Sequence, residues 1–486
     1  MTGTPRNSSD APVRSLEDLL RYFHEGVKTP AQWGIGLEYE RIGLDATTAR
    51  AVPYSGPRGI EAILGAMAEK FGWTPDLEKG RIIGLDRGET HVSLEPGGQF
   101  ELSGRVHGDI AGMQSELAMF LRESGSICEP MGITLSPIGL HPVTPVEEIE
   151  WVPKGRYAIM APFLRARGRL AHHMMKATAG VQLNFDYGSE EDAMEKLRVA
   201  MALSAVTTAA SANSPLYAGK ETGYLTRRAH IWTETDPARC GLPEFAFRDG
   251  QTFRDYAEYA LDVPLLFVRR DGRWVDMEGI PFRTFLSEGR HGIAATEADW
   301  LLHLTTIFTE VRLKTYVEVR GLDSVPPALA IALAVLWKGI LYDGTARRKA
   351  WDLVSRFDHP ERLRFFDDVA RLGPAARLGD ATAGELATEL VSIARDGLRR
   401  ICGGSDLPPC AAGEDELLGP LEASLAEEGG CPAFRLVEAW RGGLSERPGR
   451  IACCFAREEQ AFLSVLESGA APDAAGAGRT GCSGAE

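Results

Sequence analysis

The chain has 486 residues, of which 44% are hydrophobic and 25% are charged, a composition typical of a globular protein long enough for two or three domains. Its formal net charge of −15 argues against a general nucleic-acid binder and against a protein that binds anionic membranes. The longest apolar helix-like run, 328–337, is too short to span a bilayer, and the polar start of the chain does not resemble a signal peptide. We therefore expect a cytoplasmic protein.

In chain order, residues 1–13 are rich in Ser, Pro and Asp and predict a disordered lead-in. Apolar residues at helical spacing, with capping residues such as Ser15, then predict a series of helices. These cover residues from 15 to about 24, 60–71, 110–124, 190–212, 253–261, 297–308 and 326–342, and much of 352–401. The segment 216–250 is expected to be rich in loops.

Residues 14–400 are expected to form one catalytic domain, followed by a cysteine-containing extension at 401–469 and a disordered tail at 470–486. Six of the eight cysteines lie beyond residue 400, and none shows C-x-x-C spacing. Reduced thiols are the expected state for a cytosolic chain, and a redox-sensitive C-terminal region is the alternative.

Four predicted strands each place polar residues at alternate positions, which puts those side chains on one face. A solvated outer face would give the same alternation in one strand, but its repetition favours a shared polar surface. In 91–103 the Pro96-Gly97-Gly98 run must bend the chain. The four sets are Glu38 and Glu40; Glu95, Gln99 and Glu101; Gln182, Asn184 and Asp186; and Arg312, Lys314, Glu318 and Arg320, the last within a strand over 310–320.

If these strands share a sheet, five or six carboxylates converge on one surface. Two carboxylates about 4 Å apart repel by roughly 4 kcal/mol at an effective dielectric of 20. Such a cluster must take up protons, pair with Arg or Lys, or hold divalent cations, and oxygen ligands favour Mg²⁺ or Mn²⁺. The chain has no G-x-x-x-x-G-K-[ST] and no G-x-S-x-G motif, and Gly34 and Gly36 do not begin a G-x-G-x-x-G motif because Leu, Glu and Tyr follow them, so a bound nucleotide would occupy neither common nucleotide-binding fold. Arg residues of the 227–239 loop, with Arg312 and Arg320, could hold a substrate carboxylate or a transferring phosphoryl group.

Several segments resemble the glutamate–cysteine ligases of the plant and proteobacterial type. The most specific is 93–104 (SLEPGGQFELSG), and the others follow in the family's order across roughly residues 30 to 400. They are 181–186 (VQLNFD), 212–215 (ANSP), 231–237 (IWTETDP), 259–264 (YALDVP), 310–314 (EVRLK) and 318–321 (EVRG).

The resemblance implies an α+β, glutamine-synthetase-like fold, in which a curved, mainly antiparallel sheet forms a funnel with helices packed outside. It also implies a reaction in which ATP phosphorylates the γ-carboxylate of L-glutamate and the amine of L-cysteine attacks the γ-glutamyl phosphate. This is the first step of glutathione synthesis. The implied Mg²⁺ (or Mn²⁺) ligands are Glu38, Glu40, Glu95, Glu101 and Glu318.

The implied catalytic residues are Arg320 and Arg312, which would stabilise charge on the acyl phosphate. Arg228 would hold the substrate carboxylate, and the other implied substrate-binding residues are Trp232, Gln182 and Asn184. Gln99 and Lys314 are the implied ATP-binding residues. The expected partners are small molecules only, with no nucleic acid and no membrane, and the protein is expected to be a monomer or a homodimer.

The chain departs from the family pattern near residue 177. Ala177 stands where the family often has Arg, and Ala179 stands where it has Cys, which could change the acceptor amine that is recognised. The alternatives are therefore a γ-glutamyl ligase with another amine acceptor and a catalytically silent binding protein of the same fold.

Overall fold

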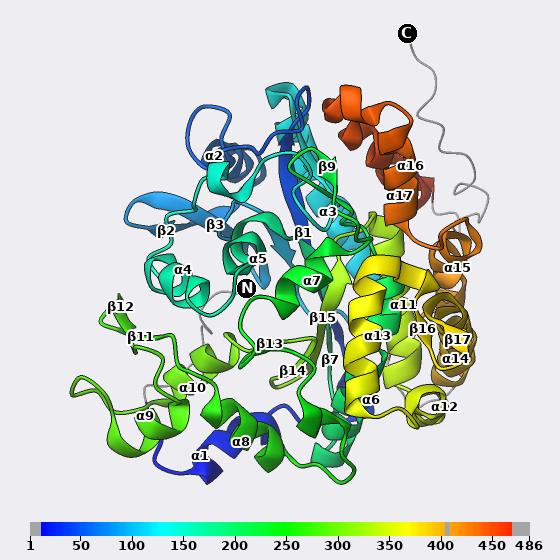
Figure 1. Ribbon diagram of the computed structural model, residues 1–486. Coiled ribbons are helices and arrows are strands. Elements are labelled where there is room, and N and C mark those ends of the chain that lie inside the picture. The colour runs from blue at the N-terminus through cyan, green and yellow to red at the C-terminus, as the bar shows by residue number, and fades with distance from the viewer. Residues whose placement is uncertain (1–10, 404–408, 469–486) are drawn as a thin grey trace.

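The computed structural model describes residues 11–403 and 409–468 (Figure 1). The predicted disordered tail and residues 1–10 of the predicted lead-in lie outside this range. The lead-in prediction is corrected for residues 11–13, because Val13 is buried and its N–H donates to the carbonyl of Ala295 at 3.0 Å.

A nine-stranded sheet runs through the molecule in the order β14-β15-β7-β1-β5-β4-β3-β2, with β6 also pairing with β1. Every pairing in this sheet is antiparallel. Its strands are β1 (Ile35–Asp45), β2 (Thr74–Glu78), β3 (Arg81–Arg87), β4 (Thr90–Leu94), β5 (Phe100–Ser103), β6 (Ile133–Ser136), β7 (Gly180–Phe185), β14 (Val311–Leu313) and β15 (Val317–Asp323). The α+β class with a mainly antiparallel sheet is therefore confirmed.

Short two-stranded pairs lie outside this sheet. They are β8 (Leu216–Tyr217) with β9 (Lys220–Glu221), β10 (Cys240–Gly241) with β13 (Phe308–Thr309), β11 (Phe267–Arg270) with β12 (Arg273–Asp276), and β16 (Arg377–Leu378) with β17 (Ala381–Thr382). Short 3₁₀ helices, η1 to η8, cover Pro30–Gln32, Glu129–Met131, Val146–Glu148, Glu244–Phe247, Gly373–Ala375, Glu414–Leu418, Leu444–Glu446 and Pro448–Arg450.

The predicted helices are present, and their ends differ from the predictions by a few residues. Ser15 and Asp18 form the capping box that begins α1. The loop-rich segment 216–250 contains one short helix, α7, that had no clear sequence signal. The helices are α1 (Leu16–His24), α2 (Ile60–Phe71), α3 (Ile110–Cys128), α4 (Tyr157–Arg165), α5 (Ala171–Ala177), α6 (Glu190–Ala210), α7 (Arg227–Thr233), α8 (Phe253–Asp262), α9 (Phe282–Glu288), α10 (Glu297–Leu304), α11 (Pro327–Leu341), α12 (Gly344–Val354), α13 (His359–Leu372), α14 (Ala383–Cys402), α15 (Gly419–Ala426), α16 (Pro432–Arg441) and α17 (Ile451–Ser468).

The stretch 310–320 is a hairpin and not the single strand that its alternation predicts. β14 and β15 pair in antiparallel register around residues 314–316, with Arg312 opposite Glu318. The turn contains Lys, Thr and Tyr, so it lacks the Gly, Asn or Pro that usually marks a turn in a sequence. Directly opposed residues share a face of the sheet, so the predicted grouping of Arg312 with Glu318 survives the correction.

The two faces of the sheet differ in chemistry. Apolar odd-numbered residues of β1, β7 and β15, among them Leu37, Leu183 and Val319, are buried in the main hydrophobic core. α6 and α11 pack against these strands. In Figure 1, α4, α5 and α7 lie in front of the sheet.

Residues 409–468 pack against the preceding part of the chain as part of the same core. Leu418, Leu421 and Phe462 belong to the main hydrophobic cluster. Lys338, a buried cation in the otherwise apolar α11, donates to the carboxylate of Glu414 at 2.6 Å. Because a buried charge is costly without a partner, this ion pair ties the C-terminal residues to α11.

Two further observations concern the cysteines and the apolar helices. Cys402 and Cys410 form a disulfide, so the expectation that the cysteines are reduced is wrong for this pair. Within the described range, no single helix has the length and hydropathy of a membrane span. The helices α11 and α12 have that length and hydropathy only when taken together, and the chain bends by 99° between them.

Candidate functional site

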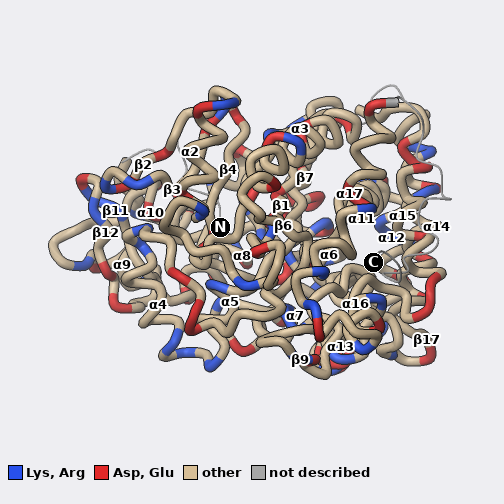
Figure 2. Tube along the Cα trace, turned by 90° about the horizontal axis from the view of Figure 1, so that it is seen from above, with Lys and Arg blue, Asp and Glu red and all other residues tan. Residues whose placement is uncertain are grey.

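Cross-strand pairing brings the predicted polar sets side by side on one face of the sheet. Figure 2 shows charged residues gathered inside the molecule around β1, β6 and β7, as well as over its outside. Because the strands are antiparallel and in register, polar side chains from distant parts of the sequence become direct neighbours. The opposed residues are Glu38 with Gln182, Glu40 with Glu101, Asn184 with Glu318, and Arg312 with Glu318.

Glu318 is surrounded by cations. Arg312 binds it with two hydrogen bonds, Nε to Oε2 at 2.8 Å and Nη2 to Oε1 at 2.7 Å. Arg320 Nη1 lies 2.6 Å from Glu318 Oε1, and Lys314 Nζ lies 3.2 Å from Oε2. Burial acts to raise the pKa of Glu318, but Arg312, Lys314 and Arg320 together hold it well below its usual range. A metal role for Glu318, as predicted, would require these cations to move away.

Glu38 and Glu40, on the neighbouring strand β1, are in the opposite situation. Burial, and then the charges of Glu318 and Glu101, raise the pKa of Glu38 to about 7. Burial, and then Glu95 and Glu101, raise the pKa of Glu40 to about 8. These carboxylates receive mainly neutral donors, namely Asn184 Nδ2 on Glu38 at 3.3 Å and the Gly180 N–H on Glu40 at 2.6 Å. Their mutual repulsion is therefore only partly offset within the described residues.

The 95–99 turn brings the third polar set to the same place. Gln99 uses its side chain to hold this turn, because it accepts from the Gly97 N–H at 2.8 Å and donates to the Thr178 carbonyl at 2.8 Å. This geometry favours a structural role for Gln99 over the predicted contact with ATP. Asp186, at the end of β7, likewise binds locally, accepting from the Gly34 N–H at 2.8 Å and Lys28 Nζ at 2.7 Å.

Two cations that sequence reasoning missed, Lys154 and Arg156, act electrostatically on Glu95 and Glu101. Their loop is fixed to the 95–99 turn by a hydrogen bond from the Val152 N–H to the Pro96 carbonyl at 2.9 Å. Burial, and then Arg156, lower the pKa of Lys154 to about 8. An irregular loop has no periodic pattern, so nothing in the sequence indicated their position.

A small cavity adjoins this polar face, and Arg228, Trp232, Glu310 and Arg320 line it with Phe308 and Thr309. Within the described residues, Arg228 Nε, Trp232 Nε1 and Glu310 Oε2 are buried without a hydrogen-bond partner. Burial raises the pKa of Glu310 to about 7, although Arg228 and Arg320 lower it. Buried polar atoms that lack partners and face a cavity indicate a place where a polar ligand can complete their hydrogen bonds.

Helix α7 positions two of these residues. Thr226 caps the helix by accepting from the Ala229 N–H at 3.3 Å, and its hydroxyl donates to Asp323 at 2.9 Å. Arg228 and Trp232 are one helical turn apart, with the guanidinium 5.8 Å from the indole ring centre. Gly180 leaves room for this guanidinium, since a Cβ there would lie 2.6 Å from Arg228 Nη2.

The structure therefore brings most of the predicted site residues together. Arg320 joins the two parts, because it contacts Gln182 and Glu318 on the sheet and also lines the cavity. Lys314 contacts Glu318 and Tyr316, the latter at 3.1 Å between Nζ and Oη. Glu310 lies in the alternating stretch but has no role in the predicted site. The same alternation that identified Arg312 and Glu318 could have identified Glu310, because all three stand at even positions.

The carboxylates of β1 and β5 fit a hard divalent cation by chemistry. Among the described residues, no group of three or more His, Cys, Asp or Glu side chains is arranged as a formed metal site. Glu38 Oε2 nevertheless has no hydrogen-bond partner within that range, and the raised pKa values of Glu38 and Glu40 reflect burial and repulsion that a cation would relieve. Carboxylate oxygens are the ligands that Mg²⁺ prefers.

Comparison with known proteins identifies the family. Residues 34–449 match the model of glutamate-cysteine ligase family 2. The chain belongs to this family. It is 40% identical over 388 residues to the chloroplastic glutamate–cysteine ligase of Brassica juncea, covering 79% of this chain and 75% of that one. It is 39% identical to the chloroplastic enzyme of Arabidopsis thaliana, covering 79% and 74%. The chain is thus a ligase of the glutamate–cysteine ligase family, as the motifs predicted.

A solved glutamate–cysteine ligase from Francisella tularensis, in complex with AMP, is 12% identical and gives a TM-score of 0.48, covering 94% of this chain and 96% of that one. We infer nothing from so low a similarity. The prediction of a cytoplasmic location is contradicted by the curated relatives, which are named as chloroplastic enzymes.

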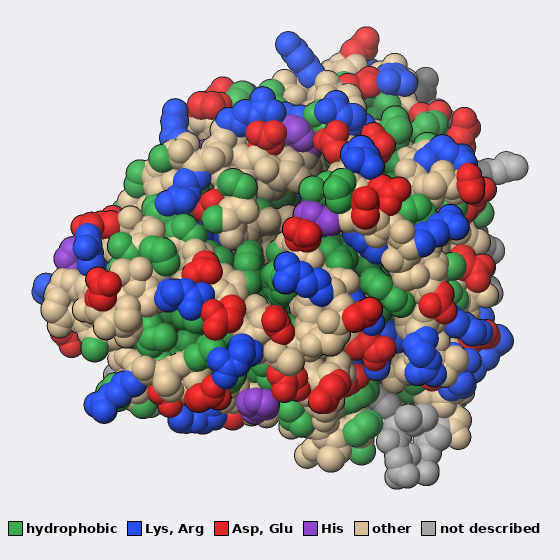
Figure 3. Space-filling view, turned by 60° about the horizontal axis from the view of Figure 1, so that its bottom comes forward, with side chains coloured by type: hydrophobic (Ala, Val, Ile, Leu, Met, Phe, Trp, Pro, Cys, Tyr) green, Lys and Arg blue, Asp and Glu red, His purple; other side chains and the backbone are tan. Residues whose placement is uncertain are grey.

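One face of the molecule carries charges of both signs. On the face that Figure 3 shows, Lys and Arg are interspersed with Asp and Glu, and hydrophobic side chains are recessed between them. Proteins that bind nucleic acid through the phosphate backbone instead concentrate Lys and Arg on one surface.

Proposed function

We propose that this protein uses ATP to phosphorylate the γ-carboxylate of L-glutamate and joins the product to the amine of L-cysteine, the first step of glutathione synthesis. The observation that carries the proposal is the contact between an acidic sheet face (Glu38, Glu40 and Glu101) and a cavity lined by Arg228, Arg320 and Glu310. An amino acid with two carboxylates and an ammonium group needs cationic and anionic side chains in its pocket. A nucleotide phosphate needs a surface beside it that binds a metal cation. Membership of the family supports the same reaction.

Glutamate binds at this cavity in the proposal, and the cavity, which at about 10 Å³ has room for about one water molecule, must open to admit it. Its α-carboxylate accepts from Arg228 and the Trp232 indole N–H, and its ammonium group donates to Glu310. Among the residues that line the cavity, these are the three that have a buried polar atom without a partner within the described range. The γ-carboxylate then points toward Arg320 and the sheet, where the phosphoryl group is transferred.

The γ-carboxylate oxygen attacks the γ-phosphorus of ATP, and ADP leaves. The cysteine amine then attacks the carbonyl carbon, loses a proton, and phosphate leaves with the acyl–oxygen electron pair. Arg320 stabilises the negative charge on the acyl phosphate. Arg312 acts as a positioning residue, because its bidentate bond to Glu318 fixes the carboxylate that holds Arg320.

The residues that would hold Mg²⁺ (or Mn²⁺) are Glu38, Glu40, Glu95 and Glu101. The ion would neutralise the phosphate oxygens of ATP and lower the repulsion among these carboxylates. Arg320, Arg228 and the β1 carboxylates would together align the γ-carboxylate and exclude water from the acyl phosphate.

One assay tests the reaction. The purified protein is incubated with ATP, Mg²⁺ and L-glutamate and screened against a panel of amines for phosphate release and γ-glutamyl product. Turnover with cysteine well above every other amine is the expected result. If the protein turned over none of the amines, the result would contradict the proposal and favour a catalytically silent binding protein.

The same panel tests the alternative of a different acceptor. Ala177, the last residue of α5, and Ala179, which precedes β7, are fully buried where the family pattern often has Arg and Cys. Loss of a cation near the 95–99 turn could change the amine that is recognised. A best substrate other than cysteine would select this alternative and leave the glutamate-phosphorylating step intact.

Arg320→Ala should lower turnover at least a hundredfold, because the negative charge on the acyl phosphate loses its electrostatic stabiliser. Near-normal turnover in this variant would contradict the role given to Arg320.

A further inference from the structure

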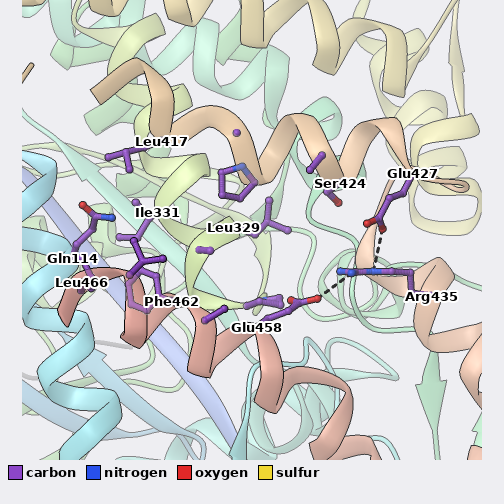
Figure 4. Close-up of a pocket in the computed structure, with 17 residues that line it drawn as sticks. Gln114, Leu329, Ile331, Leu417, Ser424, Glu427, Arg435, Glu458, Phe462 and Leu466 are labelled. Atoms are coloured by element: carbon purple, nitrogen blue, oxygen red, sulfur yellow. Dashed lines mark hydrogen bonds and ion pairs between the residues drawn. The ribbon is translucent and has the colours of Figure 1, made fainter. Parts of the chain in front are cut away.

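A second cavity, of about 300 Å³, lies between α11, α15 and α17 and is separate from the polar face of the sheet (Figure 4). Its walls are mostly apolar and include Leu329 and Ile331 of α11, Leu417 of η6, and Phe462 and Leu466 of α17. A cavity of this size with apolar walls and few polar groups has the general character of a small-molecule site.

The charged groups of this cavity gather at one end, and the polar side chain of Gln114 lies at the other (Figure 4). Arg435 lies between Glu458 and Glu427, with Nη1 2.9 Å from Glu458 Oε1 and Nε 3.4 Å from Glu427 Oε2 (Figure 4). One guanidinium therefore pairs with two carboxylates, and the formal charges of these three groups sum to −1. Burial raises the pKa of Glu458, so the pairing with Arg435 does not fully compensate its loss of hydration.

A buried hydroxyl gives an independent sign of a missing ligand. Ser424 lines the cavity and is only 8% exposed. Its Oγ has no hydrogen-bond partner among the described residues. A buried hydroxyl normally finds a partner, so a ligand with a hydrogen-bonding group at this end would satisfy it.

We propose that this cavity binds a small amphipathic amine, with its apolar body against Leu329, Ile331 and Phe462 and its ammonium group on the cavity side of the Glu458 and Glu427 carboxylates, away from Arg435 and near the Ser424 hydroxyl. An ammonium group complements the excess carboxylate, whereas a carboxylate would add to it. The apolar walls select a hydrocarbon or aromatic body over a polar one. None of the residues involved takes part in the proposed ligase reaction, so the site is additional to it.

Three probes that share a phenylbutyl carbon skeleton and differ in their polar end test the charge preference on the full-length protein. They are 4-phenylbutylamine, 4-phenylbutan-1-ol and 4-phenylbutyrate, with binding measured by calorimetry and by ligand-observed NMR. The amine is expected to bind at least tenfold more tightly than the alcohol and the carboxylate. Equal binding of all three, or binding of none, would overturn the proposal without any variant.

Ala423→Phe fills the cavity and is expected to weaken amine binding at least tenfold, while Glu458→Gln weakens it at least fivefold. Ala456→Phe, on the exposed side of α17, is the matched control and leaves binding unchanged. Phosphate release with saturating glutamate and acceptor confirms that each variant is folded. Amine binding that survives Ala423→Phe would place the amine elsewhere, including the acceptor position of the ligase site, and would overturn the proposal. Concentration-dependent dimerisation that Ala423→Phe abolishes would instead assign the cavity to a second copy of the chain.

Discussion

Glu318 and Glu38 lie on one face of the same sheet and are both buried, yet their surroundings shift their pKa values in opposite directions. Three cations surround Glu318 and hold its pKa down, whereas Glu38 is next to other carboxylates and its pKa rises to about 7. The difference shows that one polar surface contains two kinds of carboxylate. Glu318 is the anchor of an arginine cluster, and Glu38 belongs to an acidic group that can accept a cation.

Glu318→Gln should cause the largest change, because it leaves Arg312, Arg320 and Lys314 buried without their shared anion. Breaking a buried ion pair from one side costs about 3–5 kcal/mol. We expect a loss of that size in the free energy of unfolding, measured in guanidinium chloride, together with a strong loss of turnover. The control is Glu148→Gln, which breaks the exposed pair with Arg50 and should cost about 1 kcal/mol or less. Equal effects of the two substitutions would show that Glu318 is not an anchor.

Glu38→Gln should separate activity from stability. Turnover is expected to fall about a hundredfold, because the acidic group loses a carboxylate that would hold the cation. The free energy of unfolding should not fall in this variant. Because folding raises the pKa of Glu38, the folded protein keeps a proton on this carboxyl between pH 4.5 and about 7, where the unfolded chain has released it. The wild-type protein therefore loses stability as pH rises through that window without divalent cations, and the variant loses less. A loss of stability at pH 8 as large as that of Glu318→Gln would erase the distinction between the two carboxylates.

Mg²⁺ should stabilise the wild-type protein through the acidic group. At a concentration ten times its Kd, a ligand specific for the folded state adds about 1.4 kcal/mol. We expect a rise in Tm on addition of MgCl₂, measured by differential scanning fluorimetry and reversed by chelation. Glu38→Gln should reduce this rise, whereas Glu148→Gln should leave it unchanged. The same rise in all three proteins would place the cation away from β1.

The polar strands were predictable from the sequence because alternation reports which side chains share a face. The sequence also predicted the bend at Gly97 and Gly98 and the apolar helix α11. The hairpin turn at 314–316 was not predictable, because Lys, Thr and Tyr favour a strand as much as a turn. The opposed positions of Arg312 and Glu318 made this error harmless for the site, since both residues stay on one face.

The ionisation states within the site could not be predicted from the sequence. Residue type gives Glu38 and Glu318 the same expected chemistry, and only the three-dimensional placement of Arg312, Lys314 and Arg320 distinguishes them. Lys154 and Arg156 reach the site on an irregular loop, and Lys338 is neutralised by Glu414 from a distant part of the chain. Such contacts depend on tertiary packing and leave no local pattern.

Glu310 offers the smallest but most specific test of the cavity. Its raised pKa of about 7 means that about one-tenth of it is charged at pH 6 and nine-tenths at pH 8. An ammonium group needs the charged form, so KM for glutamate should fall about tenfold between these pH values, while kcat changes less. Glu310→Gln should raise KM and remove this pH dependence, and Glu310→Asp should retain part of it. A pH dependence of KM that persists unchanged in Glu310→Gln would mean that another group receives the ammonium. Glu310 would then only offset the positive charges of Arg228 and Arg320 at the cavity wall.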